Sequence, residues 1–484
     1  MLDRFFELSK RGTNVRTELL AGLTTFLTMA YIVFVQPGVL SGKMFGIETG
    51  LDFGAVTTAT CVAAALATVI MGLYANYPIG QAPGMGENFF FLSVIVAADT
   101  MIKSKVSDGT MQPGETTAWQ IALGVVFISG VLFVLVSLLG VREVLLNAVS
   151  RSMRNGIAIG IGLFIAFIGL KNASLILPDD QLAVKLNTHF ASLDLAVFFF
   201  GILFTAGLYA RKVRGSIVWG ILAATSLAVL MKVGLPYMPE EISKADIVVH
   251  SRLMSDTGLQ IADRVVSTPP SMAPTFLKMD LIGALSWTMC PFILIFLFMD
   301  LFDTLGTLIG VSEQANLIED DKLPRARQAM MSDALGTAAG AAMGTSTVTS
   351  FIESASGVEQ GGRTGLTAVT VAVLFLLTLF FSPIIAMIGS YAPITAPALV
   401  VVGSLMMRNV TKIDWSDYTE SMPSFLIIIG IPLTFSISDG LALGFIAYPI
   451  IKIFAGRGGE VKWLMYVIAL ILVCYFLFVR MQVS

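Results

Sequence analysis

The chain has 484 residues, of which 56% are hydrophobic and 13% charged, and its formal net charge is −3. This composition and the mean hydropathy of +0.83 exclude a soluble globular domain and indicate a polytopic membrane protein. The three cysteines all fall in apolar stretches and the two histidines in predicted loops, so neither a disulfide framework nor a metal cluster is expected, and carboxylates are the available proton carriers.

Apolar runs of about 20 residues are long enough to cross a bilayer as helices. We predict such spans at residues 18–40, 54–74, 119–140, 155–171, 192–210, 215–233, 282–311, 328–343, 364–388 and 394–407, with further apolar runs at 422–437, 439–454 and 463–480. The first run is too long for a signal peptide and is retained as a span. Two interpretations stay open at the other end: 463–480 is an additional span, or 422–454 is one re-entrant hairpin.

The basic residues favour a cytoplasmic N-terminus. With that orientation the inner loops carry most of the 30 Lys and Arg residues, as the positive-inside rule requires. We therefore expect a multi-pass protein of the inner or plasma membrane of the cell with its N-terminus in the cytoplasm. The long loop 234–280 then lies outside, and we assign it no function.

Two apolar segments, 83–98 and 346–358, are too short and too interrupted to be ordinary spans. The first is preceded by Gly80 and includes Pro83 and Gly84, and the second begins within a β-branched run from Thr345 to Thr349, so extended backbone is expected at both starts. Inside hydrocarbon, non-helical backbone is tolerated only where protein or a water-filled cavity satisfies it. In transporters, such segments at matching positions of two halves indicate the central binding site.

The order of segments after each interruption is similar in the two halves of the chain. Seven segments per half, an odd number, place the halves in opposite orientations, which is an inverted repeat. The predicted fold is therefore an all-α polytopic membrane protein with about 14 transmembrane segments in a 7+7 inverted repeat, including two broken half-helix segments with short extended stretches.

The apolar stretch 285–310 carries Asp300 and Asp303 near its middle. An ionised Asp at the centre of a membrane helix costs roughly 2.5–3.5 kcal/mol on insertion scales, so it persists where it faces the protein interior or a water-filled path. The spacing of three places both carboxylates on one helical face, and Thr304 and Thr307 continue that face. We interpret this polar stripe as functional.

Several long motifs occur in a fixed order: TTFLTMAYIVFVQP (24–37), QAPGMGEN (81–88), GLFIAFIGLKNA (162–173), FMDLFDTLGTLIG (298–310), GTSTVTSFIESASGVEQGGRTGLTA (344–368) and TAPALVVVG (395–403). On these motifs the chain resembles the nucleobase cation symporter-2 (xanthine/uracil permease) superfamily, and within it the AzgA-like branch of adenine, guanine and hypoxanthine permeases. The resemblance implies fourteen helices in a seven-plus-seven inverted repeat. It also implies an elevator-like movement of a substrate-holding core domain against a gate domain, usually coupled to protons.

The resemblance also suggests domain boundaries. The first halves of the core and gate domains are expected at 1–140 and 141–280, the latter with the extracellular loop, and the second halves at 281–390 and 391–484. By analogy alone, paired gate domains make a homodimer plausible. The expected partners are a purine nucleobase and the lipid bilayer, and no nucleic acid.

Carried over by motif, the substrate and coupling positions look like Asn88, Asp300, Asp303 and Glu353. The chain departs from the branch at two neighbouring positions. It has Glu87 where an apolar residue is usual, and Phe89 where Ala is usual. Glu87 is therefore a further candidate for proton coupling, and the shape of the purine pocket is open at this point.

These residue types suit a flat, mostly neutral ring with N–H donors and ring-nitrogen or carbonyl acceptors on its edges. Asp300 and Glu353 can accept from N–H groups, Asn88 can read an edge in both directions, and Phe89 or Phe351 can cover the ring. We add Thr347, from the run GTSTVTS, to the candidate substrate contacts.

Proton coupling is expected to involve Asp300, Asp303 and Glu87. A carboxyl group removed from water favours its protonated form, and a second carboxylate nearby strengthens this preference. We therefore favour H⁺ over Na⁺ as the coupling ion, with Na⁺ as the alternative because Thr and carbonyl oxygens near broken helices also bind it. No other cofactor and no metal site is predicted.

Structural roles are the alternatives for each residue. Asp300 and Asp303 can cap half-helices, Asn88 and Glu353 can be polar contacts between helices, and Glu87 can be structural or face the surface. The phenylalanines 89–91 can serve packing alone, and the small residues of GTSTVTS can permit close helix approach.

Three other functions were compared with purine import. An anion transporter of the sulfate or bicarbonate type with the same fold is disfavoured by the central acidic residues, and a uracil or xanthine permease is a second alternative. An enzyme is not expected, because the sequence contains no recognisable combination of nucleophile and base and no phosphate-binding loop.

Overall fold

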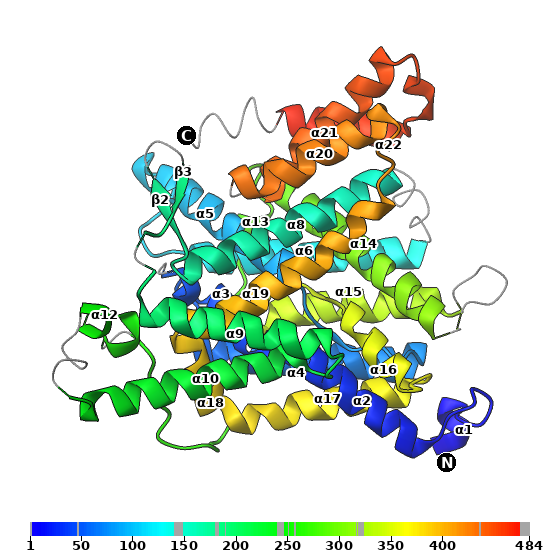
Figure 1. The fold of residues 1–484 in the computed structure, drawn as a ribbon. Coiled ribbons are helices and arrows are strands. Elements are labelled where there is room, and N and C mark those ends of the chain that lie inside the picture. The colour runs from blue at the N-terminus through cyan, green and yellow to red at the C-terminus, as the bar shows by residue number, and fades with distance from the viewer. Residues whose placement is uncertain are drawn as a thin grey trace.

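Helices make up most of the chain in this computed structural model (Figure 1). The structure describes residues 2–45, 48–139, 149–179, 183–188, 190–239, 246–249, 251–255, 258–315, 317, 324–434 and 437–474. Within these ranges, nine stretches are long and apolar enough to cross a membrane: Val15–Leu40, Phe53–Ala75, Ala118–Leu138, Arg151–Asn172, Leu193–Ala210, Ser216–Tyr237, Cys290–Ser312, Gly365–Ser390 and Ala392–Lys412. The mostly helical, polytopic architecture expected from the sequence is therefore present.

The first half of the chain is described here in order. Its elements are α1 (Leu2–Phe6), α2 (Val15–Met29), α3 (Ile32–Leu40), η1 (Lys43–Phe45), α4 (Phe53–Ile70), η2 (Met71–Ala75), β1 (Gln81–Pro83), α5 (Met85–Ser107), α6 (Ala118–Leu139), α8 (Arg151–Asn172), β2 (Ile176–Asp179), β3 (Ala183–Leu186), α9 (Leu193–Ala210), α10 (Ser216–Gly234) and η3 (Leu235–Tyr237).

The second half begins with the long loop. Its elements are α12 (Asp246–Val249), η4 (Arg252–Met254), α13 (Leu281–Ala284), α14 (Cys290–Gln314), α15 (Ala326–Met343), β4 (Val348–Ser350), η5 (Ile352–Ser354), α16 (Ala355–Glu359), α17 (Gly365–Thr378), η6 (Leu379–Phe381), α18 (Ser382–Ser390), α19 (Ala392–Met406), η7 (Met407–Lys412), α20 (Tyr418–Thr434), α21 (Ile437–Phe454), η8 (Gly458–Glu460) and α22 (Trp463–Cys474).

The two interrupted segments form a small sheet in the interior of the protein. β1 pairs with β4 in antiparallel register, with Gln81 opposite Ser350 and Pro83 opposite Val348, and both strands are buried throughout. Each strand leads into a helical segment, α5 after β1 and η5–α16 after β4. The predicted extended stretches are confirmed, although α5 is longer than the predicted segment 83–98.

Three predicted spans are divided in the structure. The run 18–40 breaks between α2 and α3, where Thr24 and Thr28 donate their hydroxyls back to helix carbonyls, a pattern that bends helices. The run 282–311 is divided between the short helix α13 and the long helix α14, which begins at Cys290, because Pro291 has no amide hydrogen and fits the first turn of a helix. Pro383 has the same position at the start of α18, which separates α18 from α17.

Two further differences concern loops and the C-terminal region. β2 and β3 form an antiparallel hairpin between α8 and α9 that the sequence pattern did not predict. The described residues of 422–454 belong to two helices, α20 and α21, that pack against each other. α22 begins at Trp463, and residues 475–480 of the predicted last run lie outside the described residues.

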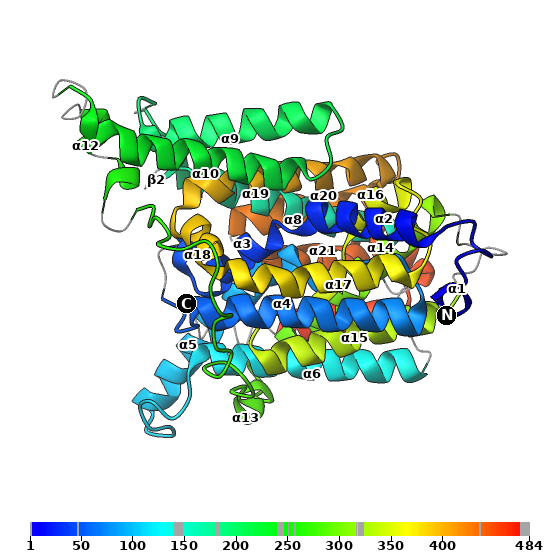
Figure 2. The same ribbon diagram turned by 90° about the horizontal axis from the view of Figure 1, so that it is seen from below.

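The helices pack in two groups. In one group α8 packs on α19 and α20, α9 packs on α10 and α19, and α20 packs on α21; in the other, α17 packs on α2 and α4, and α15 and α14 pack on α6. Figure 2 shows α9 and α10 on the opposite side of the molecule from α6 and α13. α1 and α12 lie at opposite ends of the bundle in both views, so this helix of the long loop is far from the N-terminal helix.

The long loop contacts both groups. Lys232 Nζ of α10 donates to the carbonyl of Leu259 at 2.7 Å, whereas the amide of Gln260 donates to Ser390 Oγ of α18 at 3.0 Å. Further along, the amide of Asp280 donates to the carbonyl of Gln120 in α6 at 2.9 Å. The loop therefore connects the two helix groups on one side of the membrane domain.

Candidate substrate and coupling site

The β1–β4 pair brings the predicted site residues into one region. Asp300 lies on α14 and is completely buried. Its Oδ2 accepts a hydrogen bond of 2.7 Å from Thr337 Oγ1 of α15, while its Oδ1 has no hydrogen-bond partner among the described residues. The same Thr337 oxygen accepts from the amide of Val348 in β4 at 3.1 Å, so Asp300 is connected to the sheet through one side chain.

Asp303 lies one turn further along α14 and is exposed to solvent, unlike Asp300. Thr349 Oγ1 of β4 donates to its Oδ2 at 3.4 Å. Asp303 therefore contacts β4 directly, whereas Asp300 is connected to β4 through Thr337. The sequence analysis placed Asp300 and Asp303 on one helical face and did not predict that they differ in exposure.

Glu353 follows β4 directly and is partly exposed. Tyr31, which lies at the break between α2 and α3, donates its hydroxyl to Glu353 Oε1 at 3.0 Å. The carbonyl of Glu353 accepts from Ser356 Oγ at 2.7 Å. The side chain is thereby oriented by the first membrane segment.

Asn88 approaches the same sheet from α5. It is completely buried, and its Oδ1 accepts a hydrogen bond from Ser346 Oγ. The amide of Gly84 donates to the carbonyl of Thr347 at 3.2 Å, which joins the two broken segments next to β1. The hydroxyl of Thr347 is buried and has no hydrogen-bond partner among the described residues.

Glu87 also points into the protein, with 3% of its surface exposed. Its carboxylate lies close to Gly84, where a Cβ would be 2.1 Å from Glu87 Oε2. The surface-facing alternative for Glu87 is therefore wrong. Its assignment to proton coupling remains a prediction.

The two candidate stacking residues are both buried and both contact other aromatic rings. Phe89 packs edge-to-face on Phe164 of α8, with ring centroids 5.8 Å apart. Phe351 lies 6.5 Å from the ring of Tyr31, and its amide extends the strand pairing by donating to the carbonyl of Gly80 at 3.0 Å. Phe351 is thus adjacent to the Tyr31–Glu353 contact, whereas Phe89 lies between α5 and α8.

The sequence analysis missed a further buried carboxylate, Asp333 on α15. It accepts hydrogen bonds from Gln81 of β1, from Thr304 of α14 and, at 2.9 Å, from Ser350 of β4. Asp333 therefore joins both broken segments to two helices. The signal was the same as for Asp300, a charged residue within a predicted span, and it would have identified this residue.

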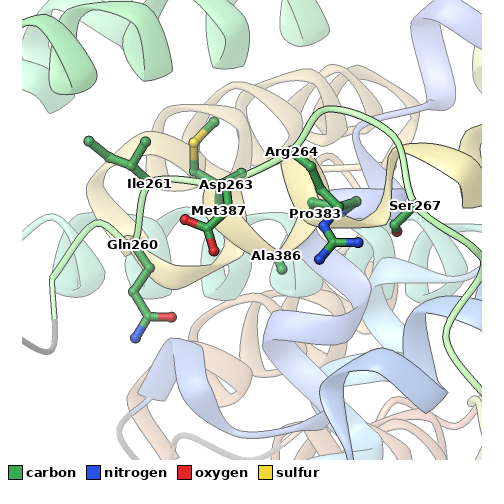
Figure 3. Close-up of a pocket in the computed structure, with 9 residues that line it drawn as sticks. Gln260, Ile261, Asp263, Arg264, Ser267, Pro383, Ala386 and Met387 are labelled. Carbon is green, nitrogen blue, oxygen red and sulfur yellow. The ribbon is translucent and has the colours of Figure 1, made fainter.

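A surface pocket of about 340 Å³ lies elsewhere on the molecule. Figure 3 shows Gln260, Asp263 and Arg264 of the long loop over Pro383 and Met387 of α18. None of the carboxylates described above lines this pocket. Within the described residues, no group of three or more His, Cys, Asp or Glu side chains is arranged to hold a metal ion.

Comparison with known proteins identifies the family. The xanthine/uracil permease model, described as a permease family, matches residues 16–478. This chain belongs to that superfamily of nucleobase permeases, the nucleobase cation symporter-2 superfamily. The permease is accordingly a multi-pass membrane protein involved in transport.

Three relatives are similar over their whole length. A permease of Methanocaldococcus jannaschii is 46% identical over 478 residues, which are 99% of this chain and 98% of the relative. The guanine/hypoxanthine permease PbuG of Bacillus subtilis is 39% identical, with 99% of this chain and 100% of the relative covered. The adenine permease AdeP of Escherichia coli is 36% identical, with coverages of 99% and 96%.

The fold of the permease resembles that of a solved transporter. The transmembrane domain of the cyanobacterial bicarbonate transporter BicA superimposes with a TM-score of 0.58, covering 90% of this chain and 97% of that domain. The two sequences are 13% identical, so the similarity concerns the fold and carries no information about the substrate.

Proposed function

We propose that this permease imports purine nucleobases, namely adenine, guanine or hypoxanthine, by proton symport with elevator-type alternating access. The observation that carries the proposal is the β1–β4 pair, around which Asn88, Asp300, Asp303 and Glu353 converge from three separate parts of the chain. The names of the relatives PbuG and AdeP support a purine substrate.

In the proposed mechanism Asn88 and Glu353 read the purine edges and Asp300 and Asp303 carry the coupling proton. Asp303 is accessible and Asp300 is buried, and the two lie one helical turn apart, so a proton can enter at one and be retained at the other. Substrate binding and protonation then favour each other, as reciprocal linkage requires. Glu87 is buried next to Asn88 in α5 and is the third proposed coupling group.

The two groups of helices support an assignment to a core and a gate. We assign the group around α2, α4, α14, α15 and α17 to the core and the group around α8, α9, α19, α20 and α21 to the gate, with the predicted boundaries at residues 140, 280 and 390. The fourteen-segment inverted repeat, the cytoplasmic N-terminus and a homodimer through the gate are parts of the same proposal. The opposite placement of α1 and α12 agrees with an extracellular long loop.

Uptake measurements test the proposed function. Cells that express the permease are supplied with radiolabelled adenine, guanine, hypoxanthine, uracil, xanthine and sulfate, with and without a protonophore. We expect accumulation of one or more of the three purines that the protonophore abolishes and that removal of Na⁺ leaves unchanged. Sulfate or bicarbonate uptake without purine uptake would overturn the proposal.

A further inference from the structure

Three buried polar side chains from separate parts of the chain form a hydrogen-bonded series that ends at Asn88. Gln36 of α3 donates through Nε2 to Ser346 Oγ at 3.0 Å and to Thr345 Oγ1 at 3.0 Å. Ser346 Oγ in turn donates to Asn88 Oδ1 of α5. Gln36, Ser346 and Asn88 are all completely buried, so water does not compete for these contacts.

In the structure the NH₂ end of the Gln36 amide faces both hydroxyls, and Gln36 Oε1 is buried without a hydrogen-bond partner among the described residues. An amide NH₂ only donates, so Ser346 Oγ accepts from Gln36, and the single proton of the Ser346 hydroxyl is free for Asn88. Asn88 Oδ1 is thereby occupied as an acceptor. The Asn88 NH₂ group has the thioether of Met85 at 4.0 Å, which is a weak acceptor, and it remains available as a donor.

We propose that Gln36 is a specificity-determining residue: acting through Ser346, it makes Asn88 present its NH₂ group to the substrate. With the Gln36 amide reversed, both hydroxyls would donate to Gln36, Ser346 would accept from Asn88, and Asn88 would present an acceptor instead. This inference rests on the proposed function, because it assumes that Asn88 contacts a purine.

The substrate feature recognised in this way is a ring nitrogen or carbonyl oxygen. Glu353, when ionised, only accepts, and its Oε1 is already engaged by Tyr31, so its second oxygen takes an N–H group. Asn88 and Glu353 belong to opposite broken segments. Together they match a purine edge on which an acceptor lies near an N–H donor, as in guanine, hypoxanthine and adenine.

The test compares purines with analogues that lack one ring acceptor. Competition constants are measured for hypoxanthine, guanine and adenine and for their 3-deaza and 7-deaza analogues, in which a C–H replaces one ring nitrogen. A buried donor left unpaired by the analogue weakens its binding. The unmodified permease is therefore expected to bind one class of deaza analogue about tenfold more weakly than the parent purine.

Gln36→Met keeps the length of the side chain and removes its hydrogen bonds, and Ser346→Ala removes the next group in the series. Each variant is expected to lose most of the discrimination between parent and analogue, about tenfold. The double variant is expected to lose no more than either single variant, because both changes break the same series. Gln36→Asn, which keeps the amide, is expected to retain part of the discrimination.

Thr60→Val is the matched control. Its hydroxyl lies 3.4 Å from Thr345 Oγ1, in the same buried region but outside the path from Gln36 to Asn88, so the discrimination ratio is expected to stay unchanged. Unaltered discrimination in Gln36→Met, or additive losses in the double variant, would overturn the inference while purine uptake persists. Absence of purine uptake by the unmodified permease would instead overturn the proposed function.

Discussion

Asp300 combines complete burial with a carboxylate oxygen that has no hydrogen-bond partner among the described residues. A buried carboxylate without full compensation is costly, whereas its protonated form is tolerated. Thr337 satisfies one oxygen, which leaves the other free to bind a proton. This environment distinguishes Asp300 from Asp303, which is exposed.

Replacing Asp300 by Asn tests the coupling role. Asn accepts from Thr337 through its amide oxygen but binds no exchangeable coupling proton, so we expect purine accumulation to fall to the level seen with a protonophore, while exchange of purine across the membrane continues. The measurement is labelled purine uptake with and without the protonophore. Accumulation equal to that of the unmodified permease would contradict the assignment.

Glu353 is the residue whose change should alter the range of substrates. Glu353→Gln replaces an acceptor by a group that also donates, so we expect at least one purine of a competition panel to bind about tenfold more weakly. Glu359→Gln, a change at an exposed acid of α16, is the control. Inhibition constants that are the same for all purines in Glu353→Gln and the unmodified permease would refute this role.

Asp333 is expected to contribute to stability. Its three donors, Gln81, Thr304 and Ser350, come from β1, α14 and β4. Asp333→Asn places an NH₂ group against donors, and the unpaired groups should lower the free energy of unfolding by about 1–3 kcal/mol. Thermal unfolding in detergent measures this loss of stability. Ser350→Ala removes only one of the three donors and is expected to lower the free energy of unfolding by less. Equal stability of Asp333→Asn and the unmodified permease would contradict it.

At the scale of elements, the break between α2 and α3 decides how the first membrane segment reaches the site. α3 supplies Gln36, and its preceding residue Tyr31 contacts Glu353. Gln36 is connected through Ser346 to Asn88 in the segment that follows β1. Tyr31 contacts Glu353 in the segment that follows β4. A continuous helix over 18–40 would not be expected to present both side chains in this way.

Helix α8 and helix α19 approach closely at a pair of glycines. A Cβ at Gly403 would lie 2.3 Å from the carbonyl oxygen of Gly162 and 2.8 Å from Ala166 Cβ. Small residues permit such contact between membrane helices. Because the obstructing atom belongs to the backbone, no side-chain movement can relieve the clash.

Gly403→Ala is therefore expected to separate α8 from α19 and to lower the free energy of unfolding by about 1–3 kcal/mol. Gly207→Ala in α9 is the control, since a Cβ there would meet nothing within 4 Å, and it should be neutral or stabilise by up to about 1 kcal/mol. Thermal unfolding of both variants in detergent provides the comparison. An equal effect of the two changes would show that the close approach is unimportant.

At the scale of the whole molecule, α5, which packs on α6 of the first group of helices, also faces α8 of the second group. A Cβ at Gly86 of α5 would be 3.9 Å from the Cβ of Ile161 in α8. Disulfides have Cβ separations of roughly 3.5–4.5 Å. A pair of cysteines at these positions can therefore be linked without rearranging the backbone.

The double variant Gly86→Cys, Ile161→Cys tests whether the core moves against the gate. In a background without the three native cysteines, oxidation should stop purine uptake and reduction should restore it, because the crosslink joins the two groups of helices. The single-cysteine variants are the controls and should be insensitive to oxidation. Full uptake by the crosslinked protein would contradict an elevator movement.

Several features were predictable from the sequence for identifiable reasons. Pro83, Gly84 and the β-branched residues of β4 favoured extended backbone, and that backbone is present at β1 and β4. Asp300 was recognisable because a charge in an apolar run is costly wherever the run folds. Asp333 carried the same signal and was missed, so this omission reflects the interpretation and not a lack of information.

The sequence by itself determined that the chain is a membrane protein with two interrupted segments and central acidic residues, because transfer of apolar and charged groups into a bilayer depends on local composition. The tertiary structure alone decided the partner of each acidic residue, the burial of Asp300 and exposure of Asp303, and the link from Gln36 to Asn88. These depend on contacts between distant parts of the chain, such as Tyr31 with Glu353 across 322 positions. Local sequence patterns contain no record of such contacts, since packing of the whole domain creates them.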